Sequence, residues 1–271
     1  MKQKIIEILI IMLLIGTAIQ AIGTNMDEVE VPIWEIGDSW TYDCTFYQCA
    51  EDDSMSSEFL SDLTFEVVDI RNELYILEGT SESLSGITNL MGLDLKFTQI
   101  TSYIADLHIR KSDLGISYHK FTMDGLFFPL FGSITFPLPI MMKYIVESDV
   151  DPVFLISPFP LFDGKEGKTL DTMIFQNAKL SLFNILTLAE FSDIVFPLGP
   201  YHYEVNDDED TVEAGTFDVL NISFSGGGDY HYFNYASEVG NFVSLKSHIT
   251  HGEGSKTYID FNIELKSTNF E

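Results

Sequence analysis

The sequence has few basic residues. Its 271 residues hold 14 Lys and Arg against 42 Asp and Glu, for a formal net charge of -28 at pH 7. Such a charge repels phosphate backbones and anionic lipid headgroups, so we do not expect nucleic acid as a partner. Attraction of cations, solubility through self-repulsion and a salty exterior all fit this charge, and the sequence leaves these alternatives open.

Cysteine is also scarce, because only Cys44 and Cys49 are present. Two residues five apart in a straight strand point to opposite faces, so a bridge between them requires a tight turn near Phe46 and Tyr47. Such a disulfide would close a very small loop and stabilise the fold by roughly 2 kcal/mol on the chain-entropy model. The residues alone leave the disulfide open, and its role would be to pin one turn.

No catalytic motif is present. The chain lacks a Gly-x-Ser-x-Gly between a strand and a helix, and its histidines are scattered. His248 and His251 are three apart, which places them on opposite faces of a strand and argues against a metal pair. The acidic runs at 51–53 and 206–210 are the best cation candidates, but the second lacks the glycine and the distal Glu of an EF-hand loop, and a solvated hairpin turn is favoured. We therefore expect no catalytic residue, no metal and no cofactor.

The first residues have the order of a secretory signal peptide. A short basic start at Lys2 and Lys4 precedes an apolar run at 8–15, and small residues follow to Gly23. A retained membrane anchor is the alternative, since 5–22 is nearly long enough to span a membrane. Removing residues 1–23 leaves 14 minus 2 basic and 42 minus 1 acidic residues, a net charge of -29. We expect an extracytoplasmic protein, with membrane contact only if this segment is retained.

Alternation of apolar and polar residues dominates the rest of the chain. It is clearest at 39–46, where Trp40, Tyr42, Cys44 and Phe46 share one face, and at 258–265. Strands with one polar face are typical of antiparallel sheets. Residues 177–191 are ambiguous, because a single helix or a buried pair of strands fits their spacing equally well.

The stretch 126–162 holds six of the nine prolines among large apolar residues. Its prolines argue against a regular central strand, and its apolar content argues against an ordinary solvated loop. It is predicted either to form irregular core-covering loops with edge strands, or to roof an apolar cavity or touch a membrane or partner. The aromatic residues predicted to line such a cavity are Phe127, Phe128, Phe131, Phe136, Phe154 and Phe159.

These patterns predict an all-β, mainly antiparallel fold. We expect a curved sheet or half-barrel, or two packed β units, with one or two short helices. The expected regions are a signal peptide at 1–23, an N-terminal β region at 24–125, the connecting segment 126–162, and a C-terminal β region at 163–271. The last region could be continuous with 34–125.

Two features stand out in the C-terminal region. Asn221 begins the Asn-Ile-Ser sequon, which could carry a glycan if its strand face is exposed. In the stretch "VEAGTFDVLNISF", Phe217 and Val219 share one parity, whereas Leu220 and the apolar positions after it take the other. This change of phase predicts a bulge or a strand that is buried on both faces.

The same stretch carries a resemblance. The order "SPFPLFDGKEGKTLDT", an acidic hairpin, "VEAGTFDVLNISF", "DYHYFNYA" and "SEVGNFVSLKS" resembles a family of uncharacterised exported archaeal and bacterial β-rich proteins, and "WEIGDSWTY" is similar to the opening of archaeal members. The residues that carry it are Pro160, Leu161, Gly164, Lys165, Val212, Ala214, Gly215, Thr216, Phe217, Tyr232, Tyr235, Gly240 and Val243. The chain departs from the family at "EGKTLDT" and in an insertion at 177–197.

The resemblance implies similarity to the curved half-barrels of periplasmic lipoprotein carriers, whose concave face can hold an acyl chain. Our leading hypothesis is a secreted or cell-surface, non-enzymatic protein that binds a hydrophobic or lipid-like ligand in a concave sheet. The alternatives are a structural envelope or interaction module without a small ligand, and a hydrolase. The expected partner is accordingly a hydrophobic ligand or an envelope component.

Overall fold

The computed structural model describes residues 28–50, 56–81, 83–90, 93–131, 134–135, 138–154, 159–183, 185–226, 229–251 and 257–270. The predicted signal segment 1–23 and the acidic run 51–53 lie outside these residues. The strands are β1 (Ser39–Ala50), β2 (Ser56–Arg71), β3 (Leu74–Ser81), β4 (Ser85–Leu90), β5 (Leu93–Arg110), β6 (Ile116–Phe131), β7 (Ile134–Thr135), β8 (Ile140–Phe154), β9 (Glu166–Lys168), β10 (Thr172–Leu182), β11 (Leu186–Leu198), β12 (His202–Val212), β13 (Gly215–Gly226), β14 (Asp229–Ala236), β15 (Asn241–His251) and β16 (Thr257–Thr268). The helical part of the described chain is one short 3-10 turn, η1 (Ser237–Val239).

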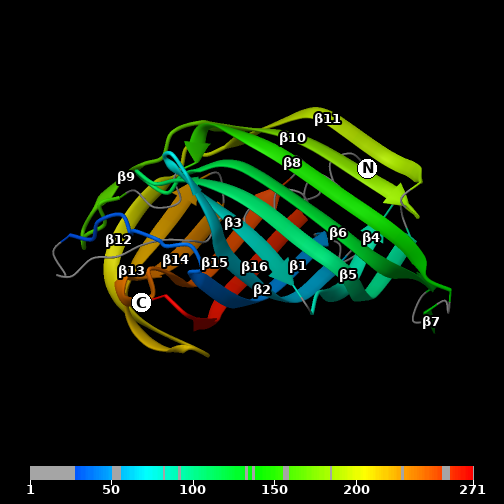
Figure 1. Cartoon of the computed structure of the whole chain (residues 1–271), viewed down its shortest axis with the longest axis horizontal. Coiled ribbons are helices and arrows are strands. Elements are labelled where there is room, and N and C mark those ends of the chain that lie inside the picture. Colours follow the sequence, from blue (N-terminus) through cyan, green and yellow to red (C-terminus); the bar gives the residue numbers. More distant parts are fainter. Residues whose placement is uncertain are drawn as a thin grey trace.

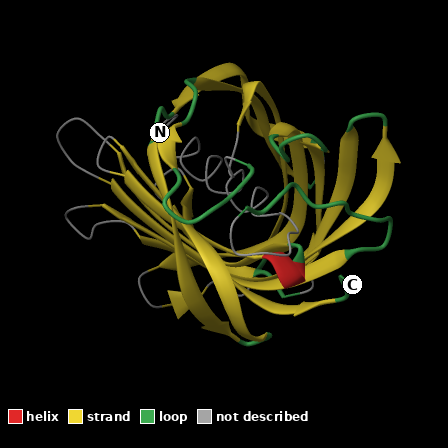
Figure 2. Cartoon of the chain, turned by 90° about the vertical axis from the view of Figure 1, so that its left-hand side faces the viewer, coloured by secondary structure: helices red, strands yellow, loops and turns green. Residues whose placement is uncertain are grey.

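All strands belong to one antiparallel sheet. Its order is β11-β10-β8-β6-β5-β3-β2-β1-β16-β15-β14-β13-β12-β9, with β4 and β7 paired off this path. The first strand lies beside the last, so β1 and β16 join the two halves of the chain (Figure 1). The sheet bends into a partial ring, and within the described chain no pairing joins its edge strands, β11 and β9 (Figure 2). The predicted all-β, curved antiparallel sheet is confirmed.

Alternation of side chains along each strand builds the core. On β1, Trp40, Tyr42, Cys44 and Phe46 are buried, whereas Asp43 between them is exposed. On β10 the same alternation runs from Thr172 to Leu180. Because no helix of the described chain covers the sheet, the buried face is the inside of the curve, which we call the concave face.

Two tryptophans fix the chain near the join between the halves. Trp34 and Trp40 pack with their ring centroids 5.1 Å apart. Their indole N–H groups donate to the backbone oxygens of Gly240 at 3.1 Å and Val239 at 2.9 Å. Gly240 has φ 63, and a Cβ there would lie 2.5 Å from the Phe270 ring, so only glycine fits the turn. The segment before β1 is thereby tied to the β14–β15 connection.

The hairpin of β12 and β13 folds back against β16, where the Ala214 N–H donates to the Leu265 carbonyl at 3.1 Å. Val219 and Leu220, neighbours of opposite parity, are both buried. The pairings of β13 show no register shift. The buried side of β13 therefore changes at Val219 and Leu220, where both faces are buried, and β13 itself has no bulge.

The structure differs from expectation in the segment 126–162. Its described part contributes to β6 and β8, and β8 is an interior strand paired with both β6 and β10. Each proline lies where pairing on one side of its strand has ended: Pro129 is opposite Leu95 of β5 but beyond the β6–β8 pairing, and Pro152 is beyond the β8–β10 pairing. The ambiguous stretch 177–191 resolves into β10 and β11, a pair of strands.

Cys44 is a free, buried thiol. β1 continues through Phe46 and Tyr47 in regular pairing with β2, so the tight turn that a bridge to Cys49 requires is absent. The Cys49 side chain lies outside the described set. Burial raises the pKa of the Cys44 thiol well above its ordinary value, with the neighbouring Asp43 and Asp62 adding to the shift.

We predict that the Cys44 thiol is unreactive while the protein is folded. In the Cys49→Ser variant, Ellman's reagent at pH 8 should modify no thiol in buffer and one thiol per chain in denaturant, since thiolate formation and access both require unfolding. The Cys44→Ser variant, which keeps only Cys49, gives the reaction of that cysteine alone for comparison. Rapid modification of Cys49→Ser in buffer would contradict the burial of Cys44.

Candidate ligand-binding surface on the concave face

The concave face is mainly apolar and rich in aromatic side chains. Phe97 of β5 and Phe127 of β6 pack with their ring centroids 5.3 Å apart. Tyr103 of β5 stacks on Phe121 of β6 at 6.2 Å. Such a lining offers favourable contact to hydrocarbon.

Three polar side chains interrupt this apolar lining in one line across the sheet. His119 of β6 lies opposite Ser148 of β8, and Ser148 lies opposite Gln176 of β10. Their relative exposures are 0%, 0% and 1%, so all three belong to the concave face. We call these three residues the concave polar row.

The concave polar row has hydrogen-bonding groups that the fold leaves unused. Gln176 Nε2 donates to Ser148 Oγ at 3.0 Å. In the described part of the chain, both ring nitrogens of His119 and the Oε1 oxygen of Gln176 have no partner. Unpaired buried polar atoms are rare, and each costs about 1–3 kcal/mol. The row therefore destabilises the fold locally unless another polar group meets it.

A tyrosine hydroxyl adds to these unused groups. The Phe121 ring lies 5.6 Å from the His119 ring on one side and 5.6 Å from the Tyr144 ring on the other. Tyr144 Oη is buried and, within the described residues, also lacks a partner. Polar and aromatic groups thus alternate over β6 and β8, as in sites for molecules with both a polar and an apolar part.

The surface is electrically neutral. Burial lowers the pKa of His119 from 6.5 to about 3, so its imidazole is uncharged at ordinary pH. Burial likewise raises the pKa of the Tyr144 hydroxyl. No carboxylate, lysine or arginine is among the buried polar side chains of the described residues. A neutral imidazole, an amide oxygen and a hydroxyl can bind an uncharged group that both donates and accepts hydrogen bonds, such as a hydroxyl.

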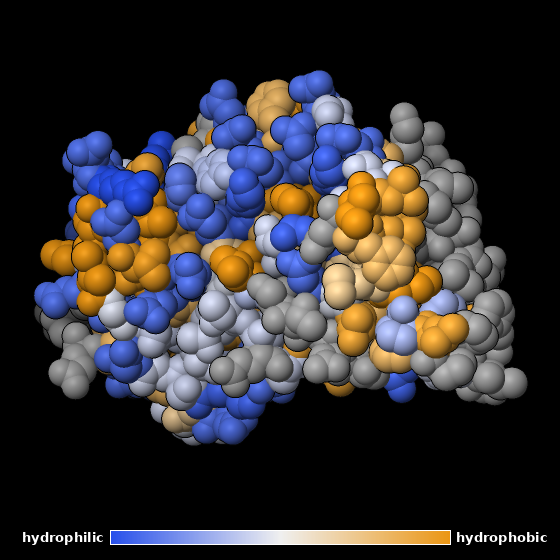
Figure 3. All heavy atoms as spheres, turned by 45° about the vertical axis from the view of Figure 1, so that its right-hand side comes forward, coloured by the Kyte–Doolittle hydropathy of each residue, from blue (hydrophilic) through white to orange (hydrophobic). Residues whose placement is uncertain are grey.

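The concave polar row reaches the open side of the ring. Gln176 lies opposite Ile194 of β11, the edge strand. Where β10 connects to β11, farther along the strands from this pair, Phe183, Ile185 and Leu186 are 56%, 89% and 60% exposed. Figure 3 shows that hydrophobic side chains gather in patches on this face of the molecule, among hydrophilic ones. The row thus ends one strand from this edge of the sheet.

The other half of the sheet holds a comparable but better satisfied histidine. His231 of β14 lies 2.9 Å from Ser247 Oγ through its Nδ1, and its ring meets Tyr201 edge-on at 5.1 Å. Burial lowers its pKa to about 4. His231 is thus a matched comparison for His119, since it has the same burial and chemistry but a partner for one nitrogen.

The six residues predicted to line a cavity do not share one surface in the structure. Phe127 is buried on the concave face. Phe128 has the opposite parity and is partly buried. Phe159 is partly buried and packs edge-on against Tyr235 at 6.0 Å. Two others, Phe131 and Phe154, belong to β6 and β8, but their side chains lie outside the described set, as does all of Phe136.

Sequence reasoning missed the concave polar row. The sequence does contain one indication of it. His119 alternates with the apolar Phe121 and Met123 on one face of the strand, where it is the polar exception. Ser148 and Gln176 could be joined to it only through the pairings of β8. The predicted sequon residue, Asn221, is partly buried, and its Nδ2 donates to Asn234 Oδ1.

Comparisons with known proteins identify no relative of this chain. No protein-family model, curated protein or solved structure matches the chain. The described residues contain no group of three metal-ligating side chains and no helix long and apolar enough to cross a membrane.

The two buried histidines predict a loss of stability in acid. Their folded-state pKa values of about 3 and about 4 lie below the ordinary 6.5, so between pH 6.5 and 4 the unfolded chain binds protons that the folded chain refuses. The free energy of unfolding should fall by about 4 kcal/mol between pH 7 and 5 from these two groups, and by about 2 kcal/mol in the His119→Leu variant. Denaturant titrations at both pH values measure this difference. An unchanged pH dependence in His119→Leu would show that His119 titrates normally.

Proposed function

We propose that the protein is an extracytoplasmic, non-enzymatic binding protein that holds a neutral amphiphile on the concave face of its curved sheet. The N-terminal sequence pattern supports the location. The absence of a nucleophile, base and orienting residue at a recognisable spacing is why the proposal is one of binding. A long-chain alcohol is the class of ligand that fits.

The unused hydrogen-bonding groups of the concave polar row carry the proposal. A hydroxyl there can donate to Gln176 Oε1 and accept from the N–H of the His119 ring, which satisfies atoms that otherwise cost free energy. The hydrocarbon chain then lies against Phe121 and the aromatic residues around it. Each hydrogen bond so formed contributes about 1 kcal/mol, and each buried methylene about 0.8 kcal/mol. The two parts of an amphiphile thus match the two parts of the surface.

The neutrality of the surface sets the ligand class. A carboxylate or phosphate brought into this surface would lose its hydration without meeting a cation, because none of the described buried side chains carries a positive charge. His119 is neutral, so it cannot supply the missing positive charge. A fatty alcohol should therefore bind more tightly than the fatty acid of the same length.

Displacement of Nile red from the full chain tests this proposal, with hexadecanol and palmitate as competitors at pH 8. Hexadecanol should displace the dye at a concentration at least about tenfold lower than palmitate does. In the double variant His119→Leu and Gln176→Leu, hexadecanol should bind about tenfold more weakly, since two hydrogen bonds are lost. Mass spectrometry of lipid extracted from the protein made in its own host identifies the natural ligand.

Stability separates this role from a merely structural one. The single variant His119→Leu replaces two unpaired ring nitrogens by an apolar side chain, so its free energy of unfolding at pH 8 should stay the same or rise. The control is His231→Leu in the other half of the sheet, which should leave hexadecanol binding unchanged. The proposal is wrong if the dye is not displaced, if palmitate competes equally well, or if the double variant binds hexadecanol as the natural chain does.

A further inference from the structure

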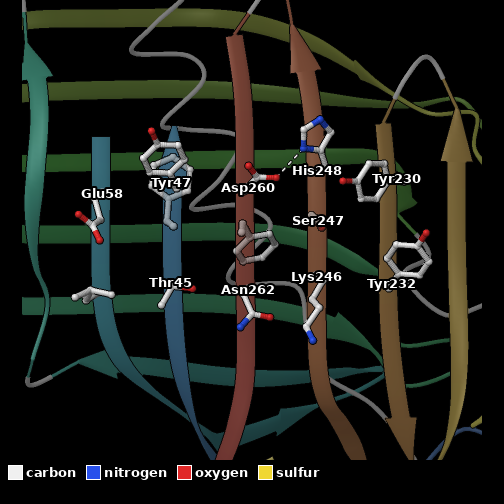
Figure 4. Close-up of a pocket in the computed structure, with 13 residues that line it drawn as sticks. Thr45, Tyr47, Glu58, Tyr230, Tyr232, Lys246, Ser247, His248, Asp260 and Asn262 are labelled. Atoms are coloured by element: carbon white, nitrogen blue, oxygen red, sulfur yellow. Dashed lines mark hydrogen bonds and ion pairs between the residues drawn. The ribbon is translucent and has the colours of Figure 1, made fainter. Parts of the chain in front are cut away.

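The outer face of the sheet carries a hollow at the join between the two halves. Its volume is about 440 Å³, within the range of about 300–1,000 Å³ that small-molecule sites occupy. It lies over β2, β1, β16, β15 and β14, which Figure 4 shows side by side. We call it the outer hollow. Its exposed side chains alternate with buried ones on the same strands, so it lies on the opposite side of the sheet from the concave face.

Two cross-strand rows of side chains line the outer hollow. The first row is Glu58, Tyr47, Asp260, His248 and Tyr230. The second row is Leu60, Thr45, Asn262, Lys246 and Tyr232. In each row, polar residues on β16 and β15 lie between β1 on one side and a tyrosine of β14 on the other. The hollow thus has a polar floor with aromatic groups at both sides.

The tyrosines form two separate platforms. Tyr230 and Tyr232 lie with their ring centroids 5.8 Å apart on β14, and both are a little over two-fifths exposed. Tyr47 stands on β1 and is 43% exposed. Three strand spacings separate β1 from β14, which is about 14 Å. A ligand that touches both platforms is therefore longer than a single six-membered ring.

The polar floor is held in place by its own contacts. His248 Nδ1 lies 2.6 Å from Asp260 Oδ1, and the Tyr230 ring stacks on the His248 ring at 4.8 Å with an interplanar angle of 12°. Asn262 Nδ2 donates to Glu264 Oε1 at 3.0 Å. Asp260 keeps 54% of its side chain exposed, so its carboxylate can accept further hydrogen bonds. Figure 4 shows the His248–Asp260 pair between the platforms.

The arrangement excludes several ligand classes. Tyr47 and Tyr230 are too far apart to surround one cation within the roughly 6 Å that a cation–π contact needs, and the positively charged Lys246 lies in the neighbouring row. An anionic polymer would meet Glu58, Asp260 and a chain of net charge -28. A metal ion would compete with His248 for Asp260.

We propose that the outer hollow binds a short, neutral oligosaccharide. Sugar rings present C–H faces that pack on tyrosine rings, and they carry hydroxyls that donate to carboxylates and accept from amides and ammonium groups. Tyr47 and the Tyr230–Tyr232 pair bind rings at the two ends, while Asp260 and Lys246 bind hydroxyls between them. This site goes beyond the amphiphile-binding role and does not depend on it, because it lies on the other face of the sheet.

Binding to the full chain is measured by calorimetry with maltotriose, cellotriose, mannotriose and chitotriose, and with trigalacturonate as the anionic comparison. At least one neutral trisaccharide should bind, its monosaccharide should bind at least about tenfold more weakly, and trigalacturonate should not bind. Tyr47→Ala and Tyr232→Ala should each weaken binding about tenfold. Phe175→Ala is the control, because Phe175 is equally exposed, at 43%, on the outer face of β10.

A blocking variant keeps the test decisive if a tyrosine variant fails to fold. Thr45→Arg places a long side chain on β1 beside Tyr47, from where it can extend over the floor at Asn262, and should abolish binding while all three tyrosines remain. The proposal is overturned if none of the neutral trisaccharides binds, if trigalacturonate binds as well as they do, or if Thr45→Arg binds normally. An equal loss in Phe175→Ala also overturns it. Nile red displacement by hexadecanol should be unchanged in these variants, so failure here is distinguishable from failure of the amphiphile proposal.

Discussion

The fold depends on the pairing of β1 with β16. This antiparallel ladder joins the first strand to the last, and without it the sheet would divide into two halves whose concave faces would lose their common interior. Trp40, buried at the start of β1, ties the same strand to the β14–β15 connection through its indole N–H. Such a contact between distant parts of the chain costs loop-closure entropy, which its aromatic burial offsets.

A single curved sheet gives every strand two faces with different surroundings. Parity therefore decides whether a residue meets the interior or the solvent, and one alternating pattern produces both surfaces described above. The concave polar row is the polar exception among apolar positions, with His119 beside Phe121. The outer hollow is the aromatic exception among polar positions, with Tyr47 between Glu58 and Asp260. Both stand out only once the side of the sheet is known.

The sequence predicts the fold class well, but it predicts poorly which strands pair and which residues meet across them. Alternation at 39–46 and 258–265 indicated the fold class, because period two needs only neighbours along the chain. Pro129 and Pro152 led to the wrong prediction that 126–162 contributes no regular interior strand. The effect of a proline depends on where strand pairing ends, and this depends on the partner strand. The concave polar row was missed for a related reason: His119, Ser148 and Gln176 come from three strands, and only register brings them into one line.

The distribution of charge follows from the same geometry. A chain with 42 acidic residues and a buried concave face must place its carboxylates on the outside, where they repel one another. In the cross-strand row next to the outer hollow, Asp62, Asp43 and Glu264 lie side by side, and Lys266 pairs with Asp62 at 2.8 Å. The outer hollow replaces this acidic pattern with tyrosines and a lysine along the join of the two halves. Because tyrosines at such exposed positions give less solubility than carboxylates, their gathering over the most interior strands of the sheet is better explained by a ligand than by the stability of the fold.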